Sequence, residues 1–330
     1  MFTEIFKFAF ISTLITVASA IVMFFFARDE ANFQDLYNEA LAEYKAKNYK
    51  KAIPIFEKAI AKKDDAPQAY YNLGLTYFKL NELDLARDNF IKVLDFTPDD
   101  TDAIQNLGMI ELQKENFLEA MSFFKKASEI VPEDAECLFN IGYTQSKLKQ
   151  EDEAMESIEK AMTINPDNVD FKQFYVDLLS SSPNLDINLD LQNKLLSNTL
   201  YLLDIYPNEE RLIFLAGTAY SKLGDWENSI KYYERAIATN PRNVLALNQY
   251  ALVLLCKGES GKSIESYEHS LEIDPNIPDT YLNLAFAYEK FGQPDSAKAM
   301  FEEFIQRFPD NPGVDIAKEY LAKNADDEEA

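Results

Sequence analysis

Residues that carry most catalytic and metal chemistry are scarce in this sequence. Its 330 residues include two cysteines, Cys137 and Cys256, and a single histidine, His269. The cysteines lie far apart without a Cys-x-x-Cys pair, and His269 has no cysteine or second histidine near it in the sequence. A disulfide or a zinc site is therefore not expected. His269 is expected on the surface rather than in a catalytic site.

Sequence motifs of enzymes are missing as well. The chain has no HExxH zinc motif, no glycine-rich phosphate loop or Walker motif and no recognisable Ser-Asp-His arrangement. A carboxylate pair that only the fold brings together would escape this search. The sequence thus predicts no catalytic residue, no metal and no cofactor, and we expect that the protein is not an enzyme.

Glycine and positive charge are also in short supply. Nine glycines in a chain that is 47% hydrophobic are too few for a turn-rich β-sandwich or barrel, and the hydrophobic content is too high for disorder. The 32 Lys and Arg residues against 56 Asp and Glu give a net charge of −24, which repels nucleic acids. We expect a mostly helical protein whose charge serves either solubility or a basic partner.

What the sequence does contain is a period. Prolines recur at Pro98, Pro132, Pro166, Pro207, Pro241, Pro275 and Pro309, and every interval is 34 residues except one of 41. A period of 34 is typical of a helix-turn-helix solenoid, in which neighbouring units supply one another's core. Proline lacks an amide donor and disfavours helix in the residue before it, so each proline marks a boundary between units.

Small and large apolar residues repeat in the same register. Small residues stand at Ala40, Gly74, Gly108, Gly142, Gly217, Ala251 and Ala285, and again at Ala52, Ala86, Ala120, Ala154, Ser229, Ser263 and Ala297. Four residues after each of the second set come Phe56, Phe90, Phe124, Ile158, Tyr233, Tyr267 and Phe301. Small residues let paired helices approach, and the large ones are expected to fill the core.

One stretch carries the pattern most clearly. Tyr70-Tyr71-Asn72-Leu73-Gly74-Leu75-Thr76-Tyr77 is followed by Ala86, Phe90 and Pro98. This arrangement resembles the tetratricopeptide repeat, and the resemblance extends from about Phe33 to Asn311. It implies an all-α fold, a right-handed α-α superhelical solenoid of about eight helix pairs whose first helices line a concave face.

The unit between Pro166 and Pro207 departs from the pattern. It is seven residues longer than the others, and Leu195 and Thr199 replace the expected alanine and phenylalanine. The stretch from Ser180 to Asn184 is expected to form a loop, which is either a hinge, a protruding contact or a tolerated insertion. The predicted organisation is repeats 1–4 at 33–168, this irregular unit at 169–209, repeats 6–8 at 210–311, a capping helix at 312–323 and an acidic tail at 324–330.

The N-terminal segment is strongly apolar. Residues 8–27 contain no charge, and a helix of this length spans about 30 Å, the hydrocarbon thickness of a bilayer. We predict an N-terminal tail and transmembrane anchor at 1–27, with the membrane segment at 8–27, and a short linker at 28–32; the alternative is a secretion signal cleaved near Ala20. Because Lys7 precedes the segment and acidic residues follow it, the repeats should face away from the cytoplasm, in the periplasm of a bacterium. A cytosol-facing array is the alternative orientation.

Amide side chains recur two residues before the first small position. They are Asn38, Asn72, Asn106, Asn140, Gln249 and Asn283. Asparagines at this position resemble the row of asparagines with which some tetratricopeptide repeat proteins hold the backbone of a bound peptide. An amide suits this role because it both donates and accepts hydrogen bonds. The amides could equally brace adjacent helices. Aromatic side chains in nearby positions, which serve either as core or as anchor pockets, complete the predicted groove: Tyr37, Tyr71, Phe139, Tyr143, Phe214 and Phe286.

Three functions follow from this resemblance. The first is a membrane-anchored scaffold that binds extended segments or partner proteins in an extracytoplasmic assembly or secretion complex. The second is a cytosol-facing receptor or chaperone-like adaptor for precursor proteins, and the third is a substrate-docking or regulatory subunit of an enzyme. Tyr71 and Leu75 stand where relatives that hold a chaperone's acidic C-terminus carry basic and amide residues, so that function is not expected.

Overall fold

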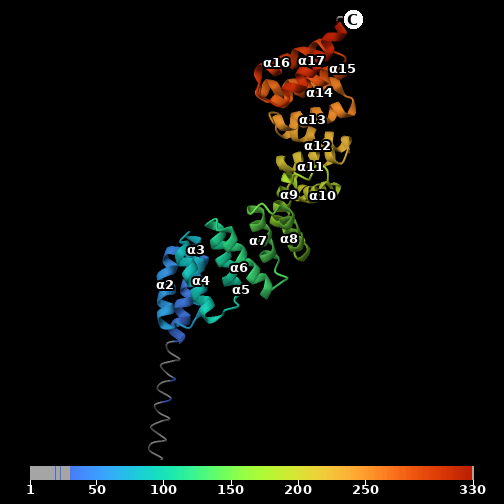
Figure 1. Cartoon of the computed structure of the whole chain (residues 1–330). Helices are drawn as coiled ribbons and strands as arrows, with labels where there is room; N and C mark the ends of the chain where they lie inside the picture. Colours follow the sequence, from blue (N-terminus) through green and yellow to red (C-terminus); the bar gives the residue numbers. More distant parts are fainter. Residues whose placement is uncertain (1–18, 20–22, 24–29, 329–330) are drawn as a thin grey trace, which may run out of the picture. The chain divides into compact units, whose positions relative to one another are not determined.

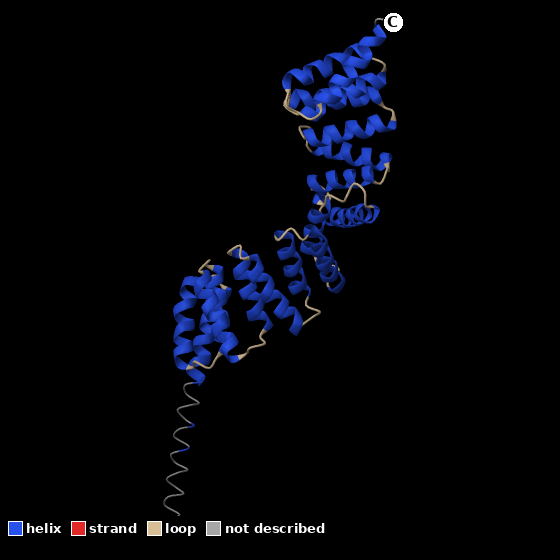
Figure 2. Cartoon of the chain, viewed as in Figure 1, coloured by secondary structure: helices blue, strands red, loops and turns tan. Residues whose placement is uncertain are grey.

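The computed structural model describes residues 19, 23 and 30–328, and every regular element within them is a helix (Figures 1 and 2). The chain divides into two compact units, which meet in the sequence between Asp167 and Asn168. We call them unit 1 and unit 2. Except for Ser19 and Met23, the predicted anchor at 8–27 lies outside the described residues. No helix within the described part is long and apolar enough to span a bilayer.

Unit 1 is a stack of four helix pairs, coloured blue to green in Figure 1. A helix over residues 30–45 precedes α2. The elements that follow are α2 (Tyr49–Lys62), α3 (Pro67–Lys79), α4 (Leu83–Phe96), α5 (Thr101–Gln113), α6 (Phe117–Ile130), α7 (Ala135–Lys147) and α8 (Glu151–Ile164). Consecutive helices pack against each other along the chain, as the 34-residue period predicts for a solenoid.

Unit 2 holds four further pairs and a final helix. Its elements are α9 (Val169–Ser181), α10 (Leu189–Ile205), α11 (Glu210–Lys222), α12 (Trp226–Thr239), α13 (Val244–Lys257), α14 (Ser260–Ile273), α15 (Pro278–Phe291), α16 (Pro294–Arg307) and α17 (Val314–Glu328). The prolines of the 34-residue period lie in the connections that follow the second helix of each pair. The all-α fold of about eight helix pairs is thus confirmed.

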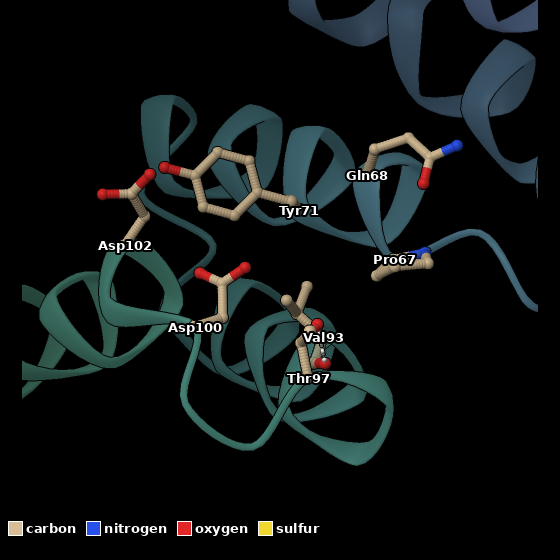
Figure 3. A pocket seen from close by; sticks show the side chains of 7 residues that line it. All are labelled: Pro67, Gln68, Tyr71, Val93, Thr97, Asp100 and Asp102. Carbon is tan, nitrogen blue, oxygen red and sulfur yellow. Dashed lines mark hydrogen bonds between the residues drawn. The ribbon is translucent and has the colours of Figure 1, made fainter. Parts of the chain in front are cut away.

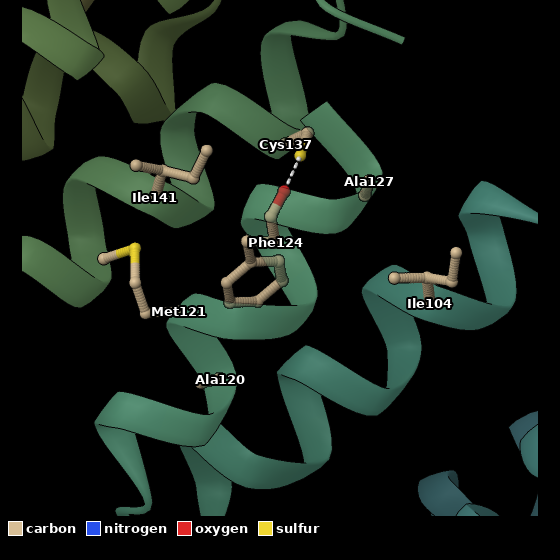
Figure 4. Close-up of a cluster of buried hydrophobic side chains, with 7 residues drawn as sticks. All are labelled: Ile104, Ala120, Met121, Phe124, Ala127, Cys137 and Ile141. Carbon is tan, nitrogen blue, oxygen red and sulfur yellow. Dashed lines mark hydrogen bonds between the residues drawn. The ribbon is translucent and has the colours of Figure 1, made fainter. Parts of the chain in front are cut away.

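The core follows the repeated register of small and large residues. Every large residue of that register is fully buried, from Phe56 to Phe301. In unit 1, Phe124 of α6 faces Gly108 of α5, where an added Cβ would lie 2.6 Å from the ring. Figure 4 shows this ring among its buried neighbours, with the Cys137 Sγ 3.3 Å from the carbonyl oxygen of Phe124. The close approach of paired helices therefore depends on the missing side chain of Gly108.

The turn inside each pair except α9–α10 contains one residue in the left-handed region of φ. In unit 1 this residue is never glycine; it is Lys47, Asn81, Glu115 or Lys149, with φ between 60° and 63°. In unit 2 the same register is held by Gly224, Gly258 and Gly292. Left-handed φ costs a residue with a Cβ roughly 1–2 kcal/mol, so the turns of unit 1 carry strain that those of unit 2 lack.

The irregular pair, α9 and α10, keeps the packing register of its neighbours. Leu195 and Thr199 are fully buried at the positions that alanine and phenylalanine occupy elsewhere. Relative to α7 and α8, the seven additional residues are divided between a loop four residues longer and a helix three residues longer. The predicted loop begins later than expected, because α9 includes Ser180 and Ser181. A larger residue at the alanine position and a smaller one at the phenylalanine position thus replace the usual pair, and α10 still packs on α9 and α11.

The last helix closes the open end of unit 2. Val314 and Ala317 of α17 are buried against a cluster that includes Phe301 and Phe304 of α16. The helix ends at Glu328, five residues beyond the predicted end of the cap and inside the predicted acidic tail. No proline or glycine follows Gly313 that would stop the helix earlier.

Candidate functional site

The predicted groove residues lie on the first helices of their pairs. Eight of the twelve are in unit 1, on the helix 30–45 and on α3, α5 and α7, and four are in unit 2. Asn38 is exposed, and the other eleven are half-buried. Half-burial means that each side chain has one face in the protein and one available to solvent. Their role in binding stays a prediction.

The asparagines of α3 and α5 bridge neighbouring repeats. The Nδ2 of Asn72 donates to the hydroxyl of Tyr37 at 2.9 Å and to the carbonyl oxygen of Gln68 at 2.8 Å. The Nδ2 of Asn106 donates in the same way to the hydroxyl of Tyr71 at 3.2 Å and to the carbonyl oxygen of Asp102 at 2.7 Å. Each amide has two donor hydrogens, and the protein uses both. Only the Oδ1 acceptors remain for a partner.

Asn140 of α7 differs from these two. Gln105, and not a tyrosine, stands 35 residues before Asn140, so no hydroxyl is there to accept a hydrogen bond from Asn140. The Nε2 of Gln105 donates to Asp134 at 2.7 Å instead. Asn38 at the start of the row accepts a hydrogen bond from Gln34 at 3.0 Å. The bridge therefore forms only where a tyrosine stands 35 residues before the asparagine. This spacing was visible in the sequence but was not recognised as a signal.

Four of the predicted groove aromatics pack directly on core rings. Tyr37 contacts Phe56 and Tyr71 contacts Phe90 in unit 1; in unit 2, Phe214 contacts Tyr233 and Phe286 contacts Phe301. The ring centroids are between 5.2 and 6.1 Å apart. Burial raises the pKa of Tyr71 and the carboxylate of Asp102 raises it further, whereas the hydrogen bond from Asn106 lowers it. These rings are partly core, so only their outer edges could contact a partner.

A pocket of about 340 Å³ opens between the first helices of unit 1; we call it the α5–α7 pocket. Seven residues of α3, α5 and α7 line it: Phe78, Met109, Leu112, Gln113, Phe139, Asn140 and Tyr143. The lining holds two amides and no charged side chain, which suits an apolar group with a few hydrogen bonds. The sequence predicted Phe139, Asn140 and Tyr143 as partner-binding residues. It missed Phe78, Leu112 and Gln113, which lie about one turn further along the same helix face.

A second pocket, of about 330 Å³, lies where α3, α4 and α5 meet; we call it the Tyr71 pocket. Its lining residues are Pro67, Gln68, Tyr71, Val93, Thr97, Asp100 and Asp102. Figure 3 shows the Tyr71 hydroxyl directed toward the Asp102 carboxylate, with Asp100 beside the ring. Asp100 caps α5 by accepting a hydrogen bond from the amide of Ala103 at 2.9 Å. We refer to the two pockets together as the candidate site.

The row of amides is interrupted in unit 2. At the corresponding position of α11 stands Leu215, which is buried. One residue before Gln249, Asn248 donates to the Thr280 hydroxyl at 2.8 Å. Gln249 and Asn283 are half-buried on α13 and α15, and neither lines the candidate site. The structure thus brings six of the predicted residues into the candidate site or into hydrogen-bond contact with it: Tyr71, Asn72, Asn106, Phe139, Asn140 and Tyr143.

The single histidine and the two cysteines lie outside the candidate site. His269 is exposed on α14, as expected, and Cys256 is exposed on α13. Cys137 is buried, and burial raises the pKa of its thiol to about 12, which keeps it protonated and unreactive at neutral pH. No group of side chains in the described part of the chain is arranged to hold a metal ion.

Three family models described as tetratricopeptide repeat match residues 37–101, 102–268 and 266–299, and the second alone covers half of the chain. Among characterised proteins, the CTR9 homolog of Arabidopsis thaliana is 29% identical over 105 residues, which are 32% of this chain and 10% of that protein. The photosystem I assembly protein Ycf3 of Synechococcus sp. (strain CC9605) is 27% identical over 119 residues, which are 32% of this chain and 69% of that protein. A solved MamA fragment from Desulfovibrio magneticus RS-1 is 16% identical, with a TM-score of 0.45, over 53% of this chain and 95% of the fragment.

Proposed function

The chain belongs to the tetratricopeptide repeat family, and we propose that it is a scaffold that holds a partner protein by an extended segment seated in the candidate site of unit 1. The α5–α7 pocket is the observation that carries this proposal. It is uncharged, apolar on most of its wall and formed by the first helices of successive repeats. A segment crossing these helices can place one apolar side chain there.

Hydrogen bonds to the amides and burial of an apolar side chain contribute different amounts to the binding free energy. A hydrogen bond contributes about 1 kcal/mol net, and burying an apolar side chain contributes about 1.5–3 kcal/mol. Micromolar binding requires about 8 kcal/mol, so the amide acceptors alone are too weak. The pocket supplies the anchor, and the acceptors of Asn72 and Asn106 fix the register of the partner's backbone.

The proposal includes the location of the array. We propose that residues 8–27 anchor the chain in a membrane and that the repeats act in an extracytoplasmic assembly. The charge-free run supports the anchor and its basic N-terminal flank supports the orientation. The Ycf3 relative, a photosystem I assembly protein, supports a role in assembly. Protease treatment of intact cells and of opened cells separates the two orientations. Protection of the repeats in cells whose outer membrane is opened and whose inner membrane is intact would contradict the extracytoplasmic location.

We also propose that the protein acts by binding alone, without catalysis. The residues of the candidate site fit a docking surface, since neither pocket pairs a nucleophile with a histidine base. A partner enzyme could still use the scaffold, and its activity would then belong to the partner.

Capture of partners by substituted full-length chains tests the binding proposal. Met109→Lys places a charge in the wall of the α5–α7 pocket and should abolish recovery of the partner. Leu85→Lys makes the same kind of change at an exposed position of α4 outside both pockets and should leave recovery unchanged. Circular dichroism establishes that both variants are folded. Equal recovery with Met109→Lys and the unsubstituted chain would refute the proposal.

A further inference from the structure

We infer that the segment held by the candidate site is basic as well as apolar: it carries a lysine or arginine for the Tyr71 pocket and an apolar residue for the α5–α7 pocket. This inference rests on the proposed function and names the chemistry of the partner. It follows from the balance of donors, acceptors and charges in the two pockets.

Most side-chain donors around the Tyr71 pocket are used inside the protein. Both Nδ2 hydrogens of Asn72 and both of Asn106 are used inside the protein. The Thr97 hydroxyl donates to the carbonyl oxygen of Val93 at 3.3 Å. What faces the Tyr71 pocket is therefore rich in acceptors, and a bound group satisfies them only if it brings donors of its own.

The charges of the Tyr71 pocket point the same way. Asp100 and Asp102 line it, and neither forms an ion pair with any described lysine or arginine. A cationic side chain entering the pocket gains from both carboxylates, whereas an anionic one is repelled and leaves the acceptors unpaired. The chain's net charge of −24 adds long-range attraction for a basic segment.

The two pockets differ in what they accept. The α5–α7 pocket has no charged side chain in its wall, so a lysine or arginine placed there would lose its hydration without a counter-charge. An apolar side chain fits it better. The basic residue is thus assigned to the pocket between α3 and α5, and the apolar residue to the pocket between α5 and α7.

The repeat fixes the spacing of these two residues. Neighbouring packed helices lie about 8–10 Å apart, and an extended chain advances about 3.3 Å per residue. The pockets are also offset along α5, because Asp102 and Leu112 lie near its opposite ends, about 15 Å apart at about 1.5 Å per residue. An extended segment that passes from one pocket to the next therefore places its basic and apolar residues about five positions apart. The Oδ1 acceptors along the same helices receive its backbone amides.

Synthetic peptides test this chemistry directly. The probe is a neutral Gly-Ser peptide with one leucine and, about five residues away, one arginine; matched peptides carry glutamine or glutamate in place of arginine. Binding to the full chain is measured by saturation-transfer NMR, which detects weak complexes. We expect the arginine peptide to bind about tenfold more tightly than the glutamate peptide, with the difference shrinking at high salt.

Substitutions in the protein assign the effect to its site. Asp102→Asn should weaken the arginine peptide about threefold and leave the glutamine peptide unchanged. Asp88→Asn, an identical change on the exposed face of α4, should alter neither. No binding of the arginine peptide, equal binding of the arginine and glutamate peptides, or equal effects of the two substitutions would overturn the inference. If Met109→Lys still abolishes capture of the natural partner, the proposed function stands without it.

Discussion

The Asn106 amide of α5 donates a hydrogen bond to the Tyr71 hydroxyl of α3, at 3.2 Å across the joint between two repeats. The same relationship joins Asn72 to Tyr37 one repeat earlier, at 2.9 Å. Asn72 and Asn106 therefore connect neighbouring repeats of unit 1 through their Nδ2 groups. Structural bracing, one of the two roles that the sequence left as alternatives, is thus present in the structure, and partner binding through the Oδ1 atoms stays a proposal.

Bracing by Asn106 can be measured with a double-mutant cycle. Tyr71→Phe and Asn106→Ala each remove the cross-repeat hydrogen bond, so their effects on stability should not add, and the coupling should be about 1 kcal/mol. Hydrogen exchange of peptides from α3 and α5 reports the local free energy. The pair Tyr71→Phe and Asn140→Ala is the control, and it should be additive because Asn140 has no cross-repeat tyrosine. Additive effects of the Tyr71 and Asn106 changes would disprove the bridge.

Close helix packing at Gly108 makes a steric prediction. Gly108→Ala brings a Cβ to 2.6 Å from the buried Phe124 ring, whereas Gly74→Ala brings one to 3.1 Å from Phe90. Overpacking of this kind costs about 1–3 kcal/mol, and we expect the Gly108 variant to be the less stable in urea unfolding followed by circular dichroism. The reverse order would show that the α5–α6 pair relaxes more easily than the contact distances imply.

Turn residues give a reciprocal pair of predictions. Lys149→Gly relieves left-handed strain in unit 1 and should stabilise it by about 0.5–1 kcal/mol, after allowing for the greater entropy of glycine in the unfolded chain. Gly258→Ala has open space around its added Cβ but keeps φ at 88°, so it should destabilise unit 2 by about 1 kcal/mol. Thermal unfolding measures both. Changes of the opposite sign would mean that side-chain contacts outweigh backbone strain.

Alkaline pH should destabilise unit 2. Burial raises the pKa of Tyr233 to about 12, and burial together with Glu234 raises the pKa of Tyr250 to about 12. A raised folded-state pKa means that the unfolded chain loses its phenolic protons first, so stability is intact below pH 10 and falls between about pH 10 and 12. Tyr233→Phe should make this fall less steep and remove one late-titrating phenol from the absorbance at 295 nm. An unchanged slope would show that Tyr233 ionises as it does in the unfolded chain.

Much of the fold could be predicted from the sequence because the same residue types recur at the same positions of each repeat. The prolines fall between pairs, and Phe90 and its equivalents fill the core. The repeat pattern does not predict how the seven additional residues are divided between the α9–α10 loop and α10, because both a longer loop and a longer helix fit between Leu179 and Leu195. Likewise, the end of α17 could not be predicted, because no proline or glycine follows Gly313.

The candidate site was less predictable, because a pocket depends on which side chains turn toward one another. Phe139, Asn140 and Tyr143 shared a predicted face and do line one pocket, but Phe78 reaches it from two repeats earlier. Asp102 looked like an ordinary acidic residue in the first turn of a helix. Its place beside Tyr71 depends on how α3 and α5 pack, which the sequence of one repeat does not contain.

Photo-crosslinking from inside the α5–α7 pocket tests the central claim most directly. A photoreactive amino acid replaces Gln113, an exposed residue of the pocket wall, or Asp88 on the outer face of α4, and cells that express the full chain are irradiated. Mass spectrometry then identifies the attached peptides. We predict that the Gln113 probe attaches to one contiguous segment of a partner protein and that the Asp88 probe does not. Equal, scattered crosslinks from both positions would contradict the claim that this pocket holds a partner segment.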